Sequence, residues 1–182
     1  MKADKDAVKN AVFESLKLIN ETLKFINWKD FTDLADMISK VKITFVVGAG
    51  RSGLVARSFG MRLMHAGLQA YIPGETITPA IHKDDLLVAI SCTGETGYTN
   101  YLAKRGKEHG GKVITFTSDE NSNLARIADK TFIVPAEGKN IVLKAATFEH
   151  TTSICLDAVF NVLKDRLKID LETYKQKHAN LE

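Results

Sequence analysis

The chain has 182 residues, of which 45% are hydrophobic and 26% are charged, and its formal net charge is +3. This composition is that of an ordinary globular domain and excludes a disordered or fibrous chain. Its lysines and arginines are scattered rather than gathered in one stripe, so we expect no nucleic-acid partner and favour small anionic metabolites.

The chain opens with two amphipathic helices. Apolar residues recur at helical spacing from Val8 to Ile26, which predicts a helix over 5–25, and a second such pattern predicts a helix over 28–40. N-terminal helices of this kind often pack on a partner subunit. The terminal helices offer more apolar face than one sheet can cover, so we expect a homo-oligomer.

Strands and helices then alternate. Helices are expected over 52–66, 98–109 and 121–127, between strands ITFVVG (43–48), QAYI (69–72), DLLVAIS (85–91), KVITFT (112–117) and KTFIV (130–134). The alternation predicts a three-layer α/β fold, with a five-stranded parallel sheet covered by helices on both faces. We expect the flavodoxin-like strand order 2-1-3-4-5.

An irregular stretch is expected over 135–146, followed by helices over 148–167 and 170–179. We interpret the chain as one domain with extra terminal helices. It divides into N-terminal helices (1–40), a sheet core (41–135), and a loop with C-terminal helices (136–182).

Two cysteines without CxxC spacing predict neither a disulfide framework nor a zinc site. The N-terminus lacks the apolar segment of a signal peptide, and no window has the roughly 20 apolar residues of a membrane span. We therefore expect a cytoplasmic protein with no membrane partner and no bound metal.

The turn GAGRSG at 48–53 matches the G-x-G-x-x-G pattern of dinucleotide sites. Such a site needs an acidic residue at the end of the second strand. Here that strand runs into Pro73, and Glu75 lies beyond the turn. The guanidinium of Arg51 and the hydroxyl of Ser52 suit a sugar phosphate better than a dinucleotide.

A second turn, SCTGETGYT at 91–99, places four hydroxyls and two glycines where a helix should begin. Helix N-termini offer free N–H groups and a positive dipole end to anions, so this pattern predicts a phosphate cradle. The alternative is an ordinary helix cap rich in Ser and Thr. In the expected strand order both turns flank one crevice, whose phosphosugar-binding residues would be Gly50, Arg51, Ser52, Ser91, Thr93, Gly94, Glu95 and Thr96.

These two turns resemble the sugar isomerase (SIS) domain. With FGMRLMHAGL, GETITPAI, KDDLLVAIS, TFEHTTSICLD and the tail KHANLE, the chain resembles the 6-phospho-3-hexuloisomerase family over nearly its whole length. The resemblance implies interconversion of D-arabino-hex-3-ulose 6-phosphate and fructose 6-phosphate, in the ribulose monophosphate route of formaldehyde fixation. It also implies a homotetramer, no cofactor, and a functional link to 3-hexulose-6-phosphate synthase.

The implied chemistry moves a proton between adjacent carbons through a cis-enediol, and so needs a base and oxyanion donors. The resemblance assigns the base to Glu149, which is expected to open its helix, where its charge would also be favourable. It assigns proton or sugar handling to His178, reaching in from a neighbouring subunit; otherwise this histidine is simply solvated. Arg51 would stabilise the enediolate, contact the phosphate, or form a surface or interface ion pair.

Cys92 lies in the second turn, but proton transfer needs no nucleophile, so we expect it only to pack. Two rival functions stay open. One is another phosphosugar isomerase, acting on a pentose or heptose phosphate. The other is a non-catalytic phosphosugar sensor, which the fold alone does not exclude.

Overall fold

Five strands form one parallel sheet in the order β2-β1-β3-β4-β5 in the computed structural model, which describes residues 2–180. The last two residues of the expected tail lie outside this range. The strands are β1 (Ile43–Gly48), β2 (Gln69–Tyr71), β3 (Leu86–Ile90), β4 (Lys112–Thr117) and β5 (Lys130–Ile133). The predicted fold class and strand order are confirmed.

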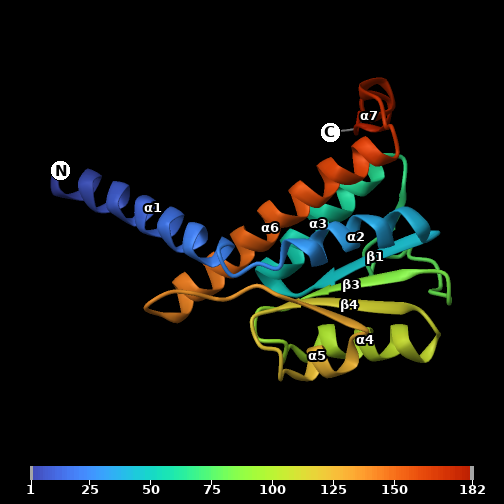
Figure 1. Cartoon of the computed structure of the whole chain (residues 1–182), viewed down its shortest axis with the longest axis horizontal. Coiled ribbons are helices and arrows are strands. Elements are labelled where there is room, and N and C mark those ends of the chain that lie inside the picture. The colour runs from blue at the N-terminus through green and yellow to red at the C-terminus, as the bar shows by residue number, and fades with distance from the viewer. Residues whose placement is uncertain (1, 181–182) are drawn as a thin grey trace.

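Helices cover both faces of the sheet (Figure 1). One face carries α2 (Trp28–Lys40), α3 (Gly50–His65) and α6 (Ile141–Arg166), and the other carries α4 (Gly97–Glu108) and α5 (Asn123–Ile127). Side chains of each strand alternate between the two faces. Val46 and Val88 pack into the core on the α3 side, whereas Phe45 and Leu87 pack into the core on the α4 side.

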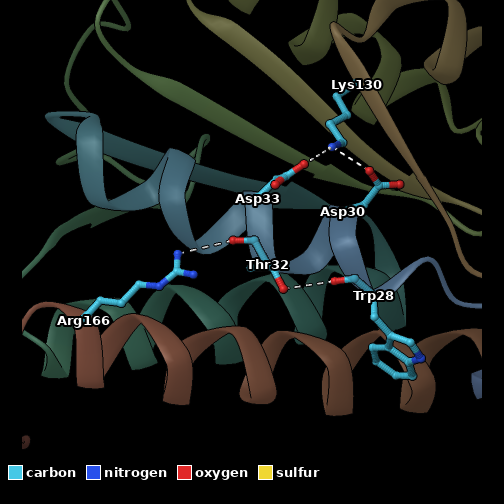
Figure 2. Close-up of polar contacts among 6 residues, drawn as sticks. All are labelled: Trp28, Asp30, Thr32, Asp33, Lys130 and Arg166. Carbon is cyan, nitrogen blue, oxygen red and sulfur yellow. Dashed lines mark hydrogen bonds and ion pairs between the residues drawn. The ribbon is translucent and has the colours of Figure 1, made fainter.

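Helix α2 is tied to the sheet edge and to α6 by polar contacts (Figure 2). Lys130 of β5 forms ion pairs with Asp30 at 2.7 Å and Asp33 at 3.3 Å. Arg166 of α6 donates a hydrogen bond to the Thr32 carbonyl at 3.5 Å. These contacts fasten α2 to strand β5 and to helix α6.

Helix α1 (Lys2–Leu23) extends away from the rest of the molecule, as Figure 1 shows, and its C-terminal part packs on α6. The described part of its predicted apolar face is largely uncovered: Val8, Val12, Phe13 and Leu16 are 67%, 52%, 59% and 54% exposed. No helix within residues 2–180 combines the length and apolar composition needed to cross a bilayer.

The expectation of an irregular stretch up to residue 146 is wrong, because α6 begins at Ile141. The Asn140 side chain caps this helix by accepting a hydrogen bond from the Leu143 N–H at 2.9 Å. Glu149 therefore lies more than two turns inside α6 and does not open it. Beyond α6, the short helix α7 (Leu171–Lys177) packs against α3.

Candidate active site

The two glycine-rich turns meet at the middle of the sheet. Strands β1 and β3 are neighbours, and Gly48 at the end of β1 pairs with Ile90 at the end of β3. The chain then enters α3 on one face and α4 on the other (Figure 1). This is the topological switch point, where open α/β sheets hold their ligands.

The first turn needs two of its glycines, Gly48 and Gly53, for close packing. A Cβ on Gly48 would lie 2.7 Å from the Ser52 carbonyl oxygen, and a Cβ on Gly53 would lie 2.9 Å from the Gly48 carbonyl oxygen. Ala49, the N-cap of α3, makes no side-chain capping bond. The first N–H groups of α3, including that of Arg51, therefore have no side-chain cap and can serve an anion.

The second turn brings two of its hydroxyls together. The Ser91 Oγ, in a residue that is only 3% exposed, lies 3.1 Å from the Thr96 Oγ1. Thr96 is the N-cap of α4 but makes no side-chain capping bond. Its hydroxyl thus faces Ser91, and the first turn of α4, like that of α3, lacks a side-chain cap.

The middle of this turn, residues 93–95, has a different arrangement. Thr93 accepts a hydrogen bond on Oγ1 from the Glu95 N–H at 3.2 Å. Gly94 has φ +67°, in the left-handed region that favours glycine. The Glu95 carboxylate accepts hydrogen bonds from the backbone and side-chain N–H groups of Asn123. Glu95 is therefore directed toward the start of α5.

Glu149 of α6 meets the first turn through an ion pair with the Arg51 guanidinium. Its side chain is only 9% exposed, whereas that of Arg51 is 62% exposed. Burial raises the pKa of the Cys92 thiol, a hydrogen bond between this thiol and the Ser118 hydroxyl opposes this, and the nearby Glu149 charge raises the pKa further. Glu149 thus lies near both turns, and Cys92 is kept as a neutral thiol.

His178 does not join this group within one chain. Its ring stacks on His65 with centroids 4.8 Å apart and planes 15° apart, at the C-terminal end of α3. Arg51 lies at the opposite end of that 16-residue helix, which is about 24 Å long. His178 is exposed, as the C-cap of α7.

The family model of the SIS domain matches residues 37–160, a range that includes both turns, Arg51 and Glu149. The chain belongs to the SIS domain family. The match begins within α2 and ends within α6, so it spans the whole sheet.

Within the SIS family, relatives named 3-hexulose-6-phosphate isomerase are similar over most of the chain. One from Methanocaldococcus jannaschii is 39% identical, covering 85% of this chain and 86% of its own. One from Bacillus subtilis is 35% identical, covering 94% and 97%. A solved Methanococcus jannaschii structure, for which that same isomerase function was inferred, is 34% identical, covers 97% and 99%, and has a TM-score of 0.84. The protein is an isomerase and groups with the 3-hexulose-6-phosphate isomerases.

The structure adds residues around the second turn, 91–99, that the sequence analysis missed. The Cys92 carbonyl accepts hydrogen bonds from the Ser118 N–H and Oγ at 2.8 Å each and from the Thr117 Oγ1 at 3.1 Å. The Asn100 Nδ2 donates to the Gly94 carbonyl at 3.1 Å. The Ser and Asn cluster that follows β4, TSDENSN, is the signal that could have indicated a second polar loop beside the first.

One cleft elsewhere on the described part of the molecule contains none of the residues of the two turns. A cleft of ≈ 720 Å³ lies near the amino ends of the strands and is lined by Lys42, Ile43, Gln69, His82, Lys83, Asp84, Asp85 and His109. It is at the opposite edge of the sheet from the two turns, so we assign the site from the residues at the switch point. In the described part of the chain, no group of three or more His, Cys, Asp or Glu residues is placed to hold a metal ion.

Proposed function

We propose that this isomerase interconverts D-arabino-hex-3-ulose 6-phosphate and fructose 6-phosphate. The observation that carries the proposal is the buried Glu149 carboxylate, paired with Arg51 and lying beside two helix N-termini that lack side-chain caps. The names of relatives that are 35–40% identical over most of the chain support the choice of substrate.

The phosphate would bind between the two turns. The hydroxyls of Ser52, Ser91 and Thr96 and the first N–H groups of α3 and α4 surround the crevice, and both helix dipoles point their positive ends toward it. No lysine is needed in this arrangement, because backbone N–H groups and hydroxyls supply the donors. Thr93, Gly50 and Gly94 would shape the same cradle.

Glu149 would act as the base. Its carboxylate takes the proton from C2 of the 3-ketose, and the negative charge that develops on O3 is stabilised by the Arg51 guanidinium. In the resulting cis-enediol, the hydroxyl proton passes from O2 to O3. The carboxylic acid of Glu149 then returns its proton to C3, so the carbonyl ends on C2 and Glu149 is ionised again.

No electron leaves the substrate in this sequence, and we expect no cofactor. The substrate is the product of an aldol addition of formaldehyde, which places the enzyme second in the ribulose monophosphate route and links it functionally to a 3-hexulose-6-phosphate synthase. We retain a cytoplasmic location as part of the proposal.

We further propose a homotetramer in which His178 enters the site of a neighbouring subunit. The exposed apolar side chains of α1 and the distance of His178 from Arg51 within one chain support this assembly. In this arrangement His178 would assist proton movement or hold a sugar hydroxyl.

The test of the proposal compares turnover of hex-3-ulose 6-phosphate with turnover of a pentose 5-phosphate and a heptose 7-phosphate. We expect the hexulose phosphate to have the highest kcat/KM by at least about tenfold, which corresponds to about 1.4 kcal/mol. A higher kcat/KM for another sugar phosphate would make that sugar phosphate the substrate. Binding of the sugar phosphates without turnover would identify a sensor.

A further inference from the structure

The phosphate loop, residues 91–96, is held from one side by the connection between β4 and α5, residues 118–122. We propose that Asn123, which follows this connection, positions the loop by holding the Glu95 carboxylate, and that Glu95 is an anchor of the loop and not a ligand of the sugar. This inference rests on the proposed function, because it takes the loop as the phosphate-binding element.

The contact between these residues occupies both oxygens of the carboxylate. The Asn123 backbone N–H donates to the Glu95 Oε1 at 2.8 Å, and the Asn123 Nδ2 donates to Oε2. A carboxylate with both oxygens engaged in this way is fixed in direction. It is also a poor neighbour for a phosphate, because the two groups carry charge of the same sign.

The backbone of the loop is held by the same segment of the chain that holds the Glu95 side chain. The Gly94 carbonyl accepts a hydrogen bond from the Leu124 N–H at 3.0 Å, and a Cβ on Gly94 would lie 2.1 Å from the Ser122 Oγ. The Cys92 carbonyl accepts its three hydrogen bonds from Thr117 and Ser118. Two loop carbonyls and the Glu95 carboxylate therefore bond to residues 117–124. These hydrogen bonds engage three sources of negative potential in the loop, which reduces their repulsion of an anion at the α4 N-terminus.

Two substitutions at position 123 remove the anchor in steps. Asn123→Ala removes only the side-chain hydrogen bond, whereas Asn123→Pro also removes the backbone N–H. Proline fits here, because Asn123 is the first residue of α5 and Ser122 before it has φ −65° and ψ 160°. The matched control is Asn121→Ala, which changes an exposed amide in the same connection.

The readout is the dissociation constant for inorganic phosphate, measured by calorimetry, together with kcat and KM for hex-3-ulose 6-phosphate. We expect phosphate binding to weaken by about threefold in Asn123→Ala and about tenfold in Asn123→Pro, since a net hydrogen bond changes affinity by such factors. KM should rise in parallel, with kcat unchanged within about twofold. The Asn121→Ala protein should match the wild type.

Glu95→Ala should change the affinity for phosphate in opposite directions for an anchor of the loop and for a residue that lines the pocket. An anchor predicts phosphate binding about tenfold weaker, and no further loss when Asn123→Pro is added. A carboxylate that merely lines the pocket predicts tighter phosphate binding once its charge is removed. Tighter binding in Glu95→Ala, or unchanged affinity in both Asn123 variants, would overturn the inference.

The phosphate measurement does not depend on turnover. A wild-type protein that binds phosphate but leaves hex-3-ulose 6-phosphate unchanged refutes the proposed function, while the affinities of the variants still decide the role of Asn123. A wild-type protein that binds no phosphate overturns both. If Asn123→Pro does not fold, Asn123→Ala and Glu95→Ala carry the test.

Discussion

The Arg51 guanidinium at the start of α3 forms an ion pair with the Glu149 carboxylate of α6, across 98 positions of sequence. The pair is asymmetric, because the Arg51 side chain is mostly exposed and the Glu149 side chain is nearly buried. An exposed guanidinium can turn toward a ligand, whereas the carboxylate is held in place. In the proposed mechanism, the same contact holds the Glu149 carboxylate in place and brings a cation to the position where an enediolate would form.

Replacing Arg51 should lower turnover more than it weakens binding. We expect kcat to fall about 100-fold in Arg51→Ala, since the loss of one oxyanion donor has an effect of this size. Arg51→Lys should recover part of the loss, because it retains the charge but not the planar guanidinium. The measurement is steady-state kinetics on hex-3-ulose 6-phosphate.

The control for this experiment is Arg105→Ala, which breaks an ion pair with Glu108 at 2.6 Å at the far end of α4. It should turn over like the wild type. A kcat that is unchanged in Arg51→Ala would remove Arg51 from the chemistry and leave it a structural ion pair.

The alkylation rate of Cys92 should depend on the charge of the nearby Glu149. Burial, opposed by the Ser118 hydrogen bond and reinforced by the Glu149 charge, raises the pKa of the Cys92 thiol. A raised pKa leaves less thiolate at pH 8 than a free cysteine has, so alkylation by iodoacetamide should be slow and should accelerate as pH rises above about 9. Glu149→Gln removes the negative charge and should speed the reaction.

Mass spectrometry follows both cysteines in one sample. Cys155, whose burial raises its pKa to about 12, is the internal control and should react more slowly than Cys92 in every variant. An alkylation rate at Cys92 that does not change in Glu149→Gln would show that the two side chains do not interact.

The strand order and the meeting of the two turns could be predicted, because the alternation of apolar strands with helices and the glycine-rich turns are local patterns. The start of α6 could not be predicted, because the apolar pattern of a helix marks the face that it buries. Ile141 and Val142 are apolar but 73% exposed, so the first turn of α6 does not follow that pattern. Only the Asn140 cap marked the helix start.

Contacts between residues far apart in the sequence could not be predicted from the sequence either. Nothing local to Glu95 indicates that Asn123 holds its carboxylate, and the ordinary interpretation of a polar residue in a binding loop is a ligand contact. The stacking of His178 on His65 likewise depends on where α7 packs, which the tail alone does not determine.

Mixing subunits of two variants tests whether an active site is shared between neighbouring subunits. Glu149→Gln and His178→Ala should each be nearly inactive as pure oligomers, and refolding them together should restore part of the activity, because some sites then combine an intact Glu149 with an intact His178. Light scattering on the same samples gives the oligomeric state. A monomer, or mixtures no more active than their components, would contradict a shared site.

Asp129 gives a pH-dependent contribution to stability. Burial opposes its ionisation, but hydrogen bonds from Lys107 and the Val113 N–H, with the charges of Lys107 and Lys112, outweigh burial and lower its pKa. A lowered folded-state pKa stabilises the fold above the unfolded value near 3.9, and this contribution disappears as pH falls through the folded value. Asp129→Asn should therefore cost about 0.5–1 kcal/mol at pH 7 and almost nothing near pH 2.

Denaturant unfolding at both pH values measures this difference. Asp165→Asn is the control, because that side chain is 77% exposed and its ion pair with Lys164 is long, at 3.5 Å. A destabilisation by Asp129→Asn that is the same at pH 7 and at low pH would show that its charge is not the cause.

The most direct test of the proposed function is formation of fructose 6-phosphate from enzymatically prepared hex-3-ulose 6-phosphate, by the wild-type protein and by Glu149→Gln, with Glu108→Gln as the matched control. We predict robust turnover by the wild type and the control, and a kcat about 1,000-fold lower in Glu149→Gln with phosphosugar affinity unchanged within about threefold. Binding without turnover in the wild type, or full turnover in Glu149→Gln, would contradict the assignment.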